Sequence, residues 1–234
     1  PGIAKGTVIE KQIASQQLGY EIAYSVYTAA GAPNASSLPV LYVTDGSEYG
    51  DPRLGNMRTI LDNLIADGLI KPIRVVFIDA RDPKNKATNR RMTELSLNEI
   101  YLKFISEELI PSVEGSQLID RSDRGILGTS LGGLSAAYFA FKRPDLFGLA
   151  GIQSPAFWYK PEIFTLAEQT GSPTLRMFLS AGTLYDAATE SKKMKAILEQ
   201  RGHTCHYFEV PEGHSWGNWS NLLDDMLLNL YSKP

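Results

Sequence analysis

Residues Arg124 to Pro144, RGILGTSLGGLSAAYFAFKRP, give the strongest indication of the fold. A short apolar run at residues 124–127 is followed by a cluster of small residues and then by an alanine-rich, helix-compatible run at residues 131–142. A strand that turns sharply into a helix is typical of a parallel sheet covered by helices. Ser130 stands at the turn, where flanking glycines allow a strained backbone that exposes the hydroxyl. The alternative is a glycine-rich turn that serves packing alone.

Apolar segments bounded by turn residues recur along the chain and alternate with helix-compatible stretches. The first two strands are separated by a short turn and predict an antiparallel pair, whereas the strand-helix alternation from Val40 onward predicts a parallel sheet with helices on both faces. We therefore expect an α/β fold with a mostly parallel eight-stranded sheet, in a single domain over residues 1–234. The expected strands are residues 7–13, 20–28, 40–44, 73–80, 124–127, 146–153, 175–180 and 204–210. The expected helices are residues 53–66, 97–113, 131–142, 161–169, 190–200 and 218–231.

Composition excludes several functional classes. The 234 residues carry a formal net charge of -3 with no long block of like charge, which argues against a nucleic-acid-binding surface. A lone Cys205 allows no internal disulfide. No apolar run approaches the ~18 residues of a membrane span. The chain begins at Pro1 without a signal pattern, which suggests removal of an upstream segment, and localisation stays open.

Three reactive side chains fall in loops at the carboxyl ends of predicted strands, where catalytic groups gather in such sheets. Ser130 lies in a G-x-S-x-G pattern and is the candidate nucleophile, and His214, after the last strand, is the candidate base. Asp186 is the candidate acid that orients the imidazole, with Glu190 as the nearest rival. The order Ser130, Asp186, His214 is the chain order of α/β-hydrolases.

A serine nucleophile of this kind needs two backbone N–H groups to stabilise an oxyanion. The residue after the nucleophile, Leu131, is expected to supply one. The loop TDGSEYG after the strand at residues 40–44 is expected to supply the other from Ser47, with Gly46 shaping the bend.

The motifs LYVTDGSEYG, VVFIDARD, NRRMTEL, GILGTSLGGLSAAYFAF, QSPAFW and EGHSWGNW occur here in the order typical of one family. In these motifs the chain resembles the esterase family of enterochelin-esterase-like and esterase D-like α/β-hydrolases, which is related to carbohydrate esterase family 1. The resemblance implies an α/β-hydrolase fold with little or no lid, and it matches Ser130, Asp186 and His214 to nucleophile, acid and base. The chain departs from the family in the acid loop GTLYD, because relatives often have fewer residues between the glycine and the acid.

Two groups of residues bear on the substrate. Six aromatic side chains in or beside the catalytic-edge loops could form a wall for a sugar or aryl ester: Tyr49, Trp158, Tyr159, Tyr185, Trp216 and Trp219. Of these, Tyr49, Trp158 and Trp216 are the substrate-binding candidates. The loop RDPKNKATNRRMTEL would suit an anionic substrate such as a catecholate siderophore. The competing interpretation is a solvated loop with one arginine buried against Glu94. The cations in question are Arg81, Lys84, Lys86, Arg90 and Arg91.

The sequence thus predicts a serine carboxylic-ester hydrolase that needs no metal or organic cofactor. Its expected partner is a small-molecule or polysaccharide-linked ester, namely a short-acyl or aryl ester such as an acylated or feruloylated sugar or a siderophore, and neither nucleic acid nor a membrane. Two alternatives stay open: an acyltransferase on the same fold and a catalytically silent binding protein. The oligomeric state is not indicated by the sequence.

Overall fold

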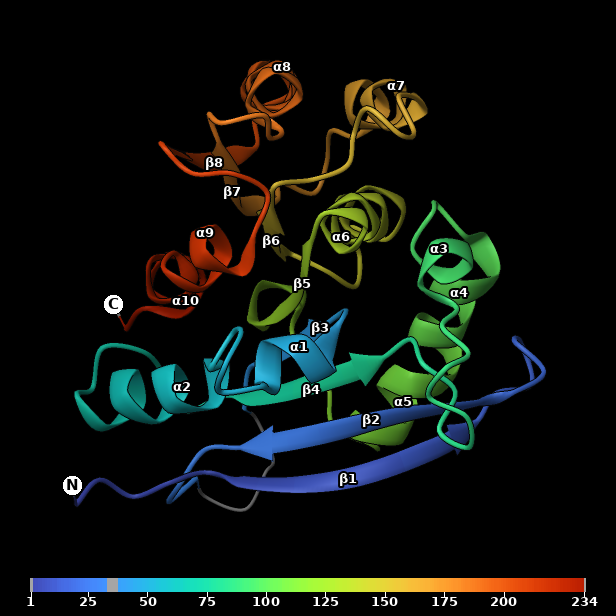
Figure 1. Ribbon diagram of the computed structural model, residues 1–234, viewed down its shortest axis with the longest axis vertical. Coiled ribbons are helices and arrows are strands. Elements are labelled where there is room, and N and C mark those ends of the chain that lie inside the picture. The colour runs from blue at the N-terminus through green and yellow to red at the C-terminus, as the bar shows by residue number, and fades with distance from the viewer. Residues whose placement is uncertain (1, 33–37, 234) are drawn as a thin grey trace.

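One sheet of eight strands organises the molecule (Figure 1). The computed structural model describes residues 2–32 and 38–233. The strand order is β1-β2-β4-β3-β5-β6-β7-β8; β2 runs antiparallel to both β1 and β4, and every later pairing is parallel. The predicted mostly parallel sheet with an antiparallel N-terminal pair is confirmed. The strands are β1 (Thr7–Ala14), β2 (Glu21–Thr28), β3 (Val40–Val43), β4 (Arg74–Asp79), β5 (Arg124–Thr129), β6 (Leu149–Gln153), β7 (Arg176–Gly182) and β8 (Thr204–Val210).

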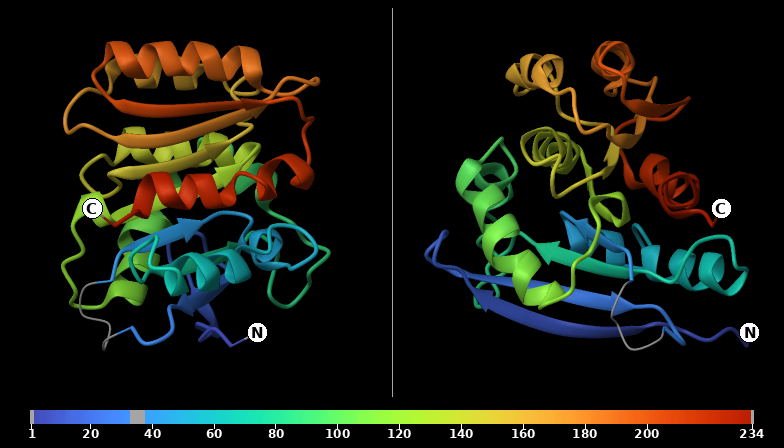
Figure 2. Two further views of the ribbon diagram at one scale, coloured as in Figure 1. Left: turned by 90° about the vertical axis from the view of Figure 1, so that its left-hand side faces the viewer. Right: turned by 180° about the vertical axis from the view of Figure 1, so that it is seen from behind.

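Helices cover both faces of this sheet, as its alternating apolar side chains require (Figure 2). In β3, Val40 and Tyr42 face one apolar core while Leu41 and Val43 face the other. The first core is closed by α4 (Glu99–Lys103), the π-helical segment η1 (Phe104–Leu109), α5 (Ile110–Glu114), α6 (Leu131–Lys142), α7 (Glu162–Gln169) and α8 (Ala188–Gln200). The second is closed by α1 (Gly46–Gly50), α2 (Met57–Ala66) and α10 (Leu223–Tyr231). Of the helices in the described part of the chain, none has the length and apolar character that crossing a membrane requires.

Several helical segments differ from the prediction. α2 begins at Met57 and not at Arg53, because Asp51 accepts a hydrogen bond from the Arg53 N–H in a turn and Asn56 adopts a left-handed backbone with φ 48°. The expected helix at residues 218–231 is two helices, α9 (Trp216–Ser220) and α10, separated at residues 221–222. Two one-turn helices, α1 and α3 (Arg91–Glu94), and a 3₁₀ turn, η2 (Arg121–Asp123), occupy segments expected to be loops.

Candidate active site

Ser130 lies at the sharp turn between β5 and α6 with a strained backbone. Its φ of 58° is in the left-handed region, which is costly for a residue with a side chain. The turn is tight because Gly128 and Gly132 approach each other so closely that a Cβ on Gly128 would overlap the backbone of Gly132. The glycines therefore serve close backbone approach, as the sequence pattern predicts.

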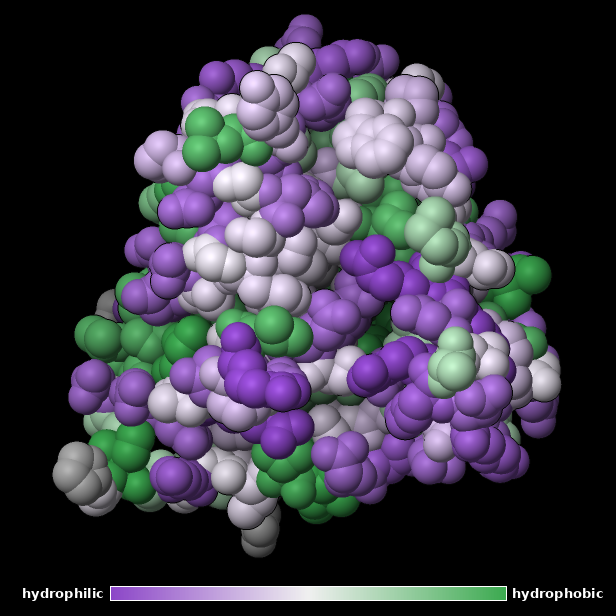
Figure 3. All heavy atoms as spheres, viewed as in Figure 1, coloured by the Kyte–Doolittle hydropathy of each residue, from purple (hydrophilic) through white to green (hydrophobic). Residues whose placement is uncertain are grey.

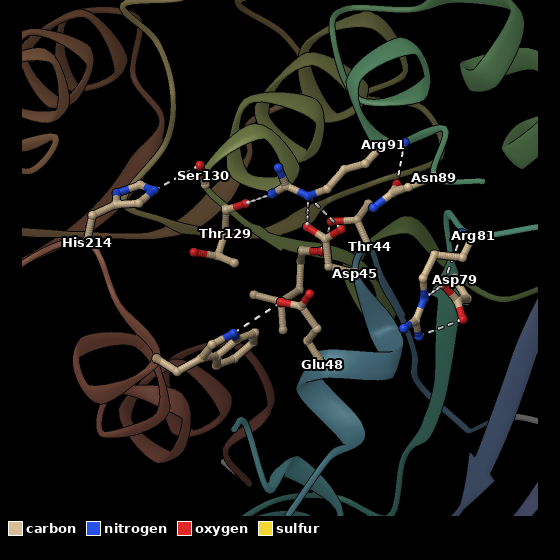
Figure 4. A network of polar contacts seen from close by, with 12 residues as sticks. Thr44, Asp45, Glu48, Asp79, Arg81, Asn89, Arg91, Thr129, Ser130 and His214 are labelled. Atoms are coloured by element: carbon tan, nitrogen blue, oxygen red, sulfur yellow. Dashed lines mark hydrogen bonds and ion pairs between the residues drawn. The ribbon is translucent and has the colours of Figure 1, made fainter. Parts of the chain in front are cut away.

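His214 links Ser130 to Asp186 through two hydrogen bonds. Its Nε2 lies 2.9 Å from Ser130 Oγ (Figure 4). Its Nδ1 lies 2.7 Å from Asp186 Oδ1. Because an ionised carboxylate only accepts hydrogen bonds, Nδ1 carries the proton and Nε2 is left to accept from the serine O–H. The Asp186 side chain is fully buried, whereas 41% of the His214 side chain is exposed. The imidazole thus faces solvent on the side from which a substrate would approach.

Asp186 is held by further donors on its second oxygen. Oδ2 accepts hydrogen bonds at 2.6 Å from both Ser154 Oγ and the Gly182 N–H, and Ser154 Oγ in turn accepts one from Trp219 Nε1 at 2.9 Å. Burial by itself would raise the pKa of Asp186, but the hydrogen bonds from His214, Ser154 and Gly182 outweigh it and lower the pKa below its ordinary value. Asp186 is therefore held in the charged form that stabilises an imidazolium.

Of the two acid candidates, Asp186 is the one brought to the histidine. Glu190 lies in the first turn of α8, beyond the loop that follows β7. The longer acid loop noted in the sequence still carries Asp186 back against the end of β7, where it meets the Gly182 N–H. The other two histidines stand apart from this site: His203 is buried and accepts from the Leu175 N–H, and His206 lies within β8.

The two predicted oxyanion donors are placed differently. Leu131 is the first residue of α6, so its N–H belongs to the first helical turn, which has no partner within the helix. Ser47 lies in α1 and lines a cavity of about 530 Å³ together with Phe77 and Asp79, whereas Ser130 lines a separate cavity of about 310 Å³. The role of Ser47 stays a prediction.

The aromatic candidates divide into exposed and buried groups. Trp158, whose surface is 68% exposed, and the fully exposed Tyr185 line the cavity beside Ser130 and His214. Tyr49 was expected to contact substrate, but it has no exposed surface. Its hydroxyl donates to Gln153 Oε1, and its ring packs edge-on against Trp216 with centroids 4.9 Å apart. Tyr49 therefore contributes to the site by packing on Trp216 and bonding Gln153, and not through an exposed surface.

Trp216 is partly exposed and joins two catalytic-edge loops. Its Nε1 donates to Glu48 Oε2 at 3.1 Å, which ties the loop of His214 to α1 (Figure 4). Trp219 is buried and places its ring edge-on against the imidazole of His214, with centroids 5.0 Å apart. Sequence reasoning did not single out Ser154 or Glu48. The one available signal for Ser154 is its place directly after β6, at the same sheet edge as the other candidates.

Every cation that the sequence offered for an anionic substrate is already paired with a carboxylate. The pairs are Arg81–Asp79, Lys84–Glu21, Lys86–Asp79, Arg90–Asp82 and Arg91–Asp45. Glu94 is buried and accepts a hydrogen bond from the Tyr20 hydroxyl; burial raises its pKa, while Arg90, which is paired with Asp82, acts on Glu94 through its charge and partly offsets that rise. The loop is locally neutralised, which reduces its suitability for an anionic ligand.

The surface of this face is mixed in character. In the view of Figure 3, pale and hydrophilic side chains make up most of the centre, and hydrophobic ones are dispersed in small groups.

Comparisons with known proteins agree with this fold. The chain is 29% identical over 200 residues to the endo-1,4-beta-xylanase/feruloyl esterase of Xylanibacter ruminicola, and 30% identical over 213 residues to the iron(III) enterobactin esterase of Escherichia coli K12. These alignments cover 82% and 86% of this chain but only 26% and 52% of those proteins. The crystal structure of the enterobactin esterase of Shigella flexneri superposes with a TM-score of 0.83 at 21% identity, over 98% of this chain and 60% of that one.

The family comparison covers nearly the whole chain. The model of the Esterase family, described as "Putative esterase", matches residues 15–230, from just after β1 to the last turn of α10. The chain therefore belongs to the esterase family that its motifs resemble.

Proposed function

We propose that this protein is a serine carboxylic-ester hydrolase in which Ser130 is the nucleophile, His214 the general base and Asp186 the residue that orients His214. The observation that carries the proposal is the unbroken pair of hydrogen bonds from Ser130 through His214 to Asp186. The strained backbone at Ser130 and the buried, multiply bonded carboxylate of Asp186 support it independently. We further propose that a single domain built on the one sheet carries this activity.

In the proposed reaction, the Ser130 hydroxyl attacks the ester carbonyl while His214 Nε2 accepts its proton. The negative charge that develops on the carbonyl oxygen is stabilised by the N–H groups of Leu131 and Ser47. His214 then donates the proton to the departing alcohol, which leaves an acyl group on Ser130. A water molecule, deprotonated by His214, attacks the acyl carbonyl and releases the acid.

The proposed substrates are short-acyl or aryl esters. The cavity at Ser130 is about 310 Å³ and is bordered by Trp158 and Tyr185, which favours a small planar or short acyl group. The names of the relatives include both feruloyl and enterobactin esterases. Because the basic side chains of the loop at residues 81–95 are already paired with carboxylates, a neutral aryl or acyl ester is favoured over a polyanionic one.

A fluorophosphonate probe tests the proposal directly. The folded protein is expected to form one adduct at Ser130, and the Ser130→Ala variant none. If the folded parent protein forms no adduct, the hydrolase proposal is wrong and a catalytically silent binding protein is favoured. Product analysis with and without a sugar acceptor then separates hydrolysis from acyl transfer, because a transferase yields mainly the acyl sugar.

A panel of acetyl, butyryl, feruloyl and long-chain acyl esters tests the substrate class. We expect kcat/KM for the acetyl, butyryl and feruloyl esters to exceed that for long-chain esters. A marked preference for the long chains contradicts the proposed class.

A further inference from the structure

Arg91 bridges two backbone segments that are distant in sequence. Its Nε donates to Asp45 Oδ1 at 2.8 Å and Oδ2 at 3.0 Å, and its Nη2 donates to the Thr129 carbonyl oxygen at 3.3 Å (Figure 4). The guanidinium comes from α3 and lies beside the turn of Ser130. One planar group thus holds the end of β5 and the loop after β3 at a fixed separation.

These two segments are the ones that carry the proposed oxyanion donors. Thr129 directly precedes Ser130 and Leu131, and Asp45 is the residue before α1, which contains Ser47. Asp45 itself has a left-handed backbone with φ 53°, which is costly outside glycine and needs support from its surroundings. The hydrogen bonds from Arg91 supply part of that support.

The segments are packed so closely that a shift in one reaches the other. Thr44 donates both its N–H, at 3.0 Å, and its hydroxyl, at 3.2 Å, to the Leu127 carbonyl. A Cβ added to Gly132, in the first turn of α6, would lie 2.5 Å from Thr44 Oγ1. Little space remains to absorb a displacement of the loop after β3.

Burial and charge also distinguish the Arg91–Asp45 pair from the neighbouring Arg81–Asp79 pair. Only 6% of the Asp45 side chain is exposed; burial raises the pKa of its carboxyl, and Arg91 partly offsets that rise. The Arg81–Asp79 pair in the same region joins residues two apart in the chain, and 39% of the Arg81 side chain is exposed. Arg91 therefore holds a buried carboxylate and a distant strand, whereas Arg81 holds its own loop.

We propose that Arg91 is a positioning residue that sets the separation of the Ser130 turn and the loop after β3, and so the geometry of the oxyanion site. The inference rests on the proposed hydrolase function. Arg91 acts through Thr129 and Asp45 and needs no contact with the substrate.

Three single-residue variants begin the test: Arg91→Gln, Arg91→Lys and the matched control Arg81→Gln. Arg91→Gln is expected to lower kcat about tenfold to a hundredfold, as misplacement of a catalytic group does. KM is expected to stay within about threefold, because the substrate-lining residues are unchanged. Arg91→Lys keeps the charge but lacks the fork that reaches both partners, so we expect partial recovery, and Arg81→Gln should behave as the parent.

A boronic acid inhibitor, which forms a tetrahedral adduct with a reactive serine, separates positioning from general destabilisation. Its inhibition constant should rise in Arg91→Gln by about the factor by which kcat/KM falls. In the double variant Asp45→Asn/Arg91→Gln, which leaves no unpaired buried charge, the melting temperature should recover while kcat stays low. If Arg91→Gln fails to fold, Arg91→Lys and the double variant carry the test.

The outcomes are distinct. A kcat within threefold of the parent in Arg91→Gln, or a full recovery of kcat in the double variant, overturns the positioning role. A parent protein that neither hydrolyses esters nor reacts with the fluorophosphonate overturns the proposed function itself, before any Arg91 variant is compared.

Discussion

Asp186 gives one carboxylate oxygen to His214 and the other to the protein frame. Oδ1 lies 2.7 Å from His214 Nδ1, while Oδ2 accepts from Ser154 and from the Gly182 N–H at 2.6 Å each. Because the two oxygens have separate partners, the hydrogen bonds from Ser154 and Gly182 to Oδ2 fix the direction in which Oδ1 points. The imidazole is thereby held in the tautomer whose Nε2 accepts from Ser130.

Asp186→Asn should therefore keep the fold and lose activity. An amide NH₂ toward Nδ1 favours the wrong tautomer, and by analogy with other triads kcat should fall on the order of 10⁴-fold. Glu190→Gln and Asp224→Asn are the matched controls, since Glu190 lies in the first turn of α8 and Asp224 in that of α10. Steady-state kinetics decide: Asp186→Asn within tenfold of the parent, with Glu190→Gln crippled, would transfer the acid role to Glu190.

Ser154→Ala should destabilise the fold in a pH-dependent way. The change removes a donor to Asp186 and leaves Trp219 Nε1 without its acceptor, which should cost about 2 kcal/mol of the free energy of unfolding at neutral pH. Since the folded-state pKa of Asp186 is lowered from 3.8, its stabilising contribution is present above that pH and is lost as the pH falls further. The difference between variant and parent should shrink at acid pH.

Ser180→Ala provides the matched control for Ser154→Ala. Ser180, within β7, is a fully buried serine like Ser154, but its Oγ has no hydrogen-bond partner among the described residues. Its replacement should change the free energy of unfolding by far less. Chemical denaturation at neutral and acid pH measures both variants, and equal losses would show that burial and not the Asp186 contact decides the effect.

Much of this architecture could be predicted because apolar periodicity is a local signal. β8 begins and ends where the pattern predicts, and the position of Ser130 between β5 and α6 follows from the turn residues. The break between α9 and α10 could not be predicted, because the apolar spacing runs across it without interruption. α1 and α3 are single turns that depend on contacts from elsewhere, such as that of Arg91 with Asp45.

The site was predictable only where a residue's role follows from its place along the chain. Loop position at the sheet edge indicated Ser130, Asp186 and His214, and the structure brings them together. The burial of Tyr49 could not be inferred, because it depends on how α1 turns against Gln153 and Trp216. Which face of a short loop points inward is a tertiary property.

Trp158→Ala and Tyr185→Ala should weaken recognition of aryl esters selectively. Both side chains line the cavity at Ser130, and loss of an aromatic contact worth about 0.5–1.5 kcal/mol should raise KM for a feruloyl ester about twofold to tenfold. kcat/KM for an acetyl ester should change little. Tyr159→Ala is the control, because Tyr159 packs on Trp158 but is not among the residues that line the cavity. Equal effects on both esters would contradict an aryl-binding role.

Glu94 should make the stability of the fold fall between mildly acid and neutral pH. Its side chain is fully buried, one oxygen accepts from the Tyr20 hydroxyl at 2.9 Å, and the other has no partner among the described residues. Burial raises the pKa of Glu94 from 4.5 to about 7. Between these two values the unfolded chain has released the proton and the folded chain has kept it, so stability decreases as pH rises and levels off above the folded-state pKa.

Glu94→Gln tests this directly, because glutamine can accept from Tyr20 and carries no charge. The free energy of unfolding of the variant minus that of the parent should be about 3 kcal/mol larger at pH 8 than at pH 4. This difference is the energy equivalent of the shift in the pKa of Glu94. Glu168→Gln, on the exposed side of α7, is the matched surface control and should show no such gain. Denaturant unfolding at the two pH values measures the difference. A constant offset between Glu94→Gln and the parent would mean that Glu94 is ionised throughout, held by Arg90 nearby, and that burial alone does not govern its titration.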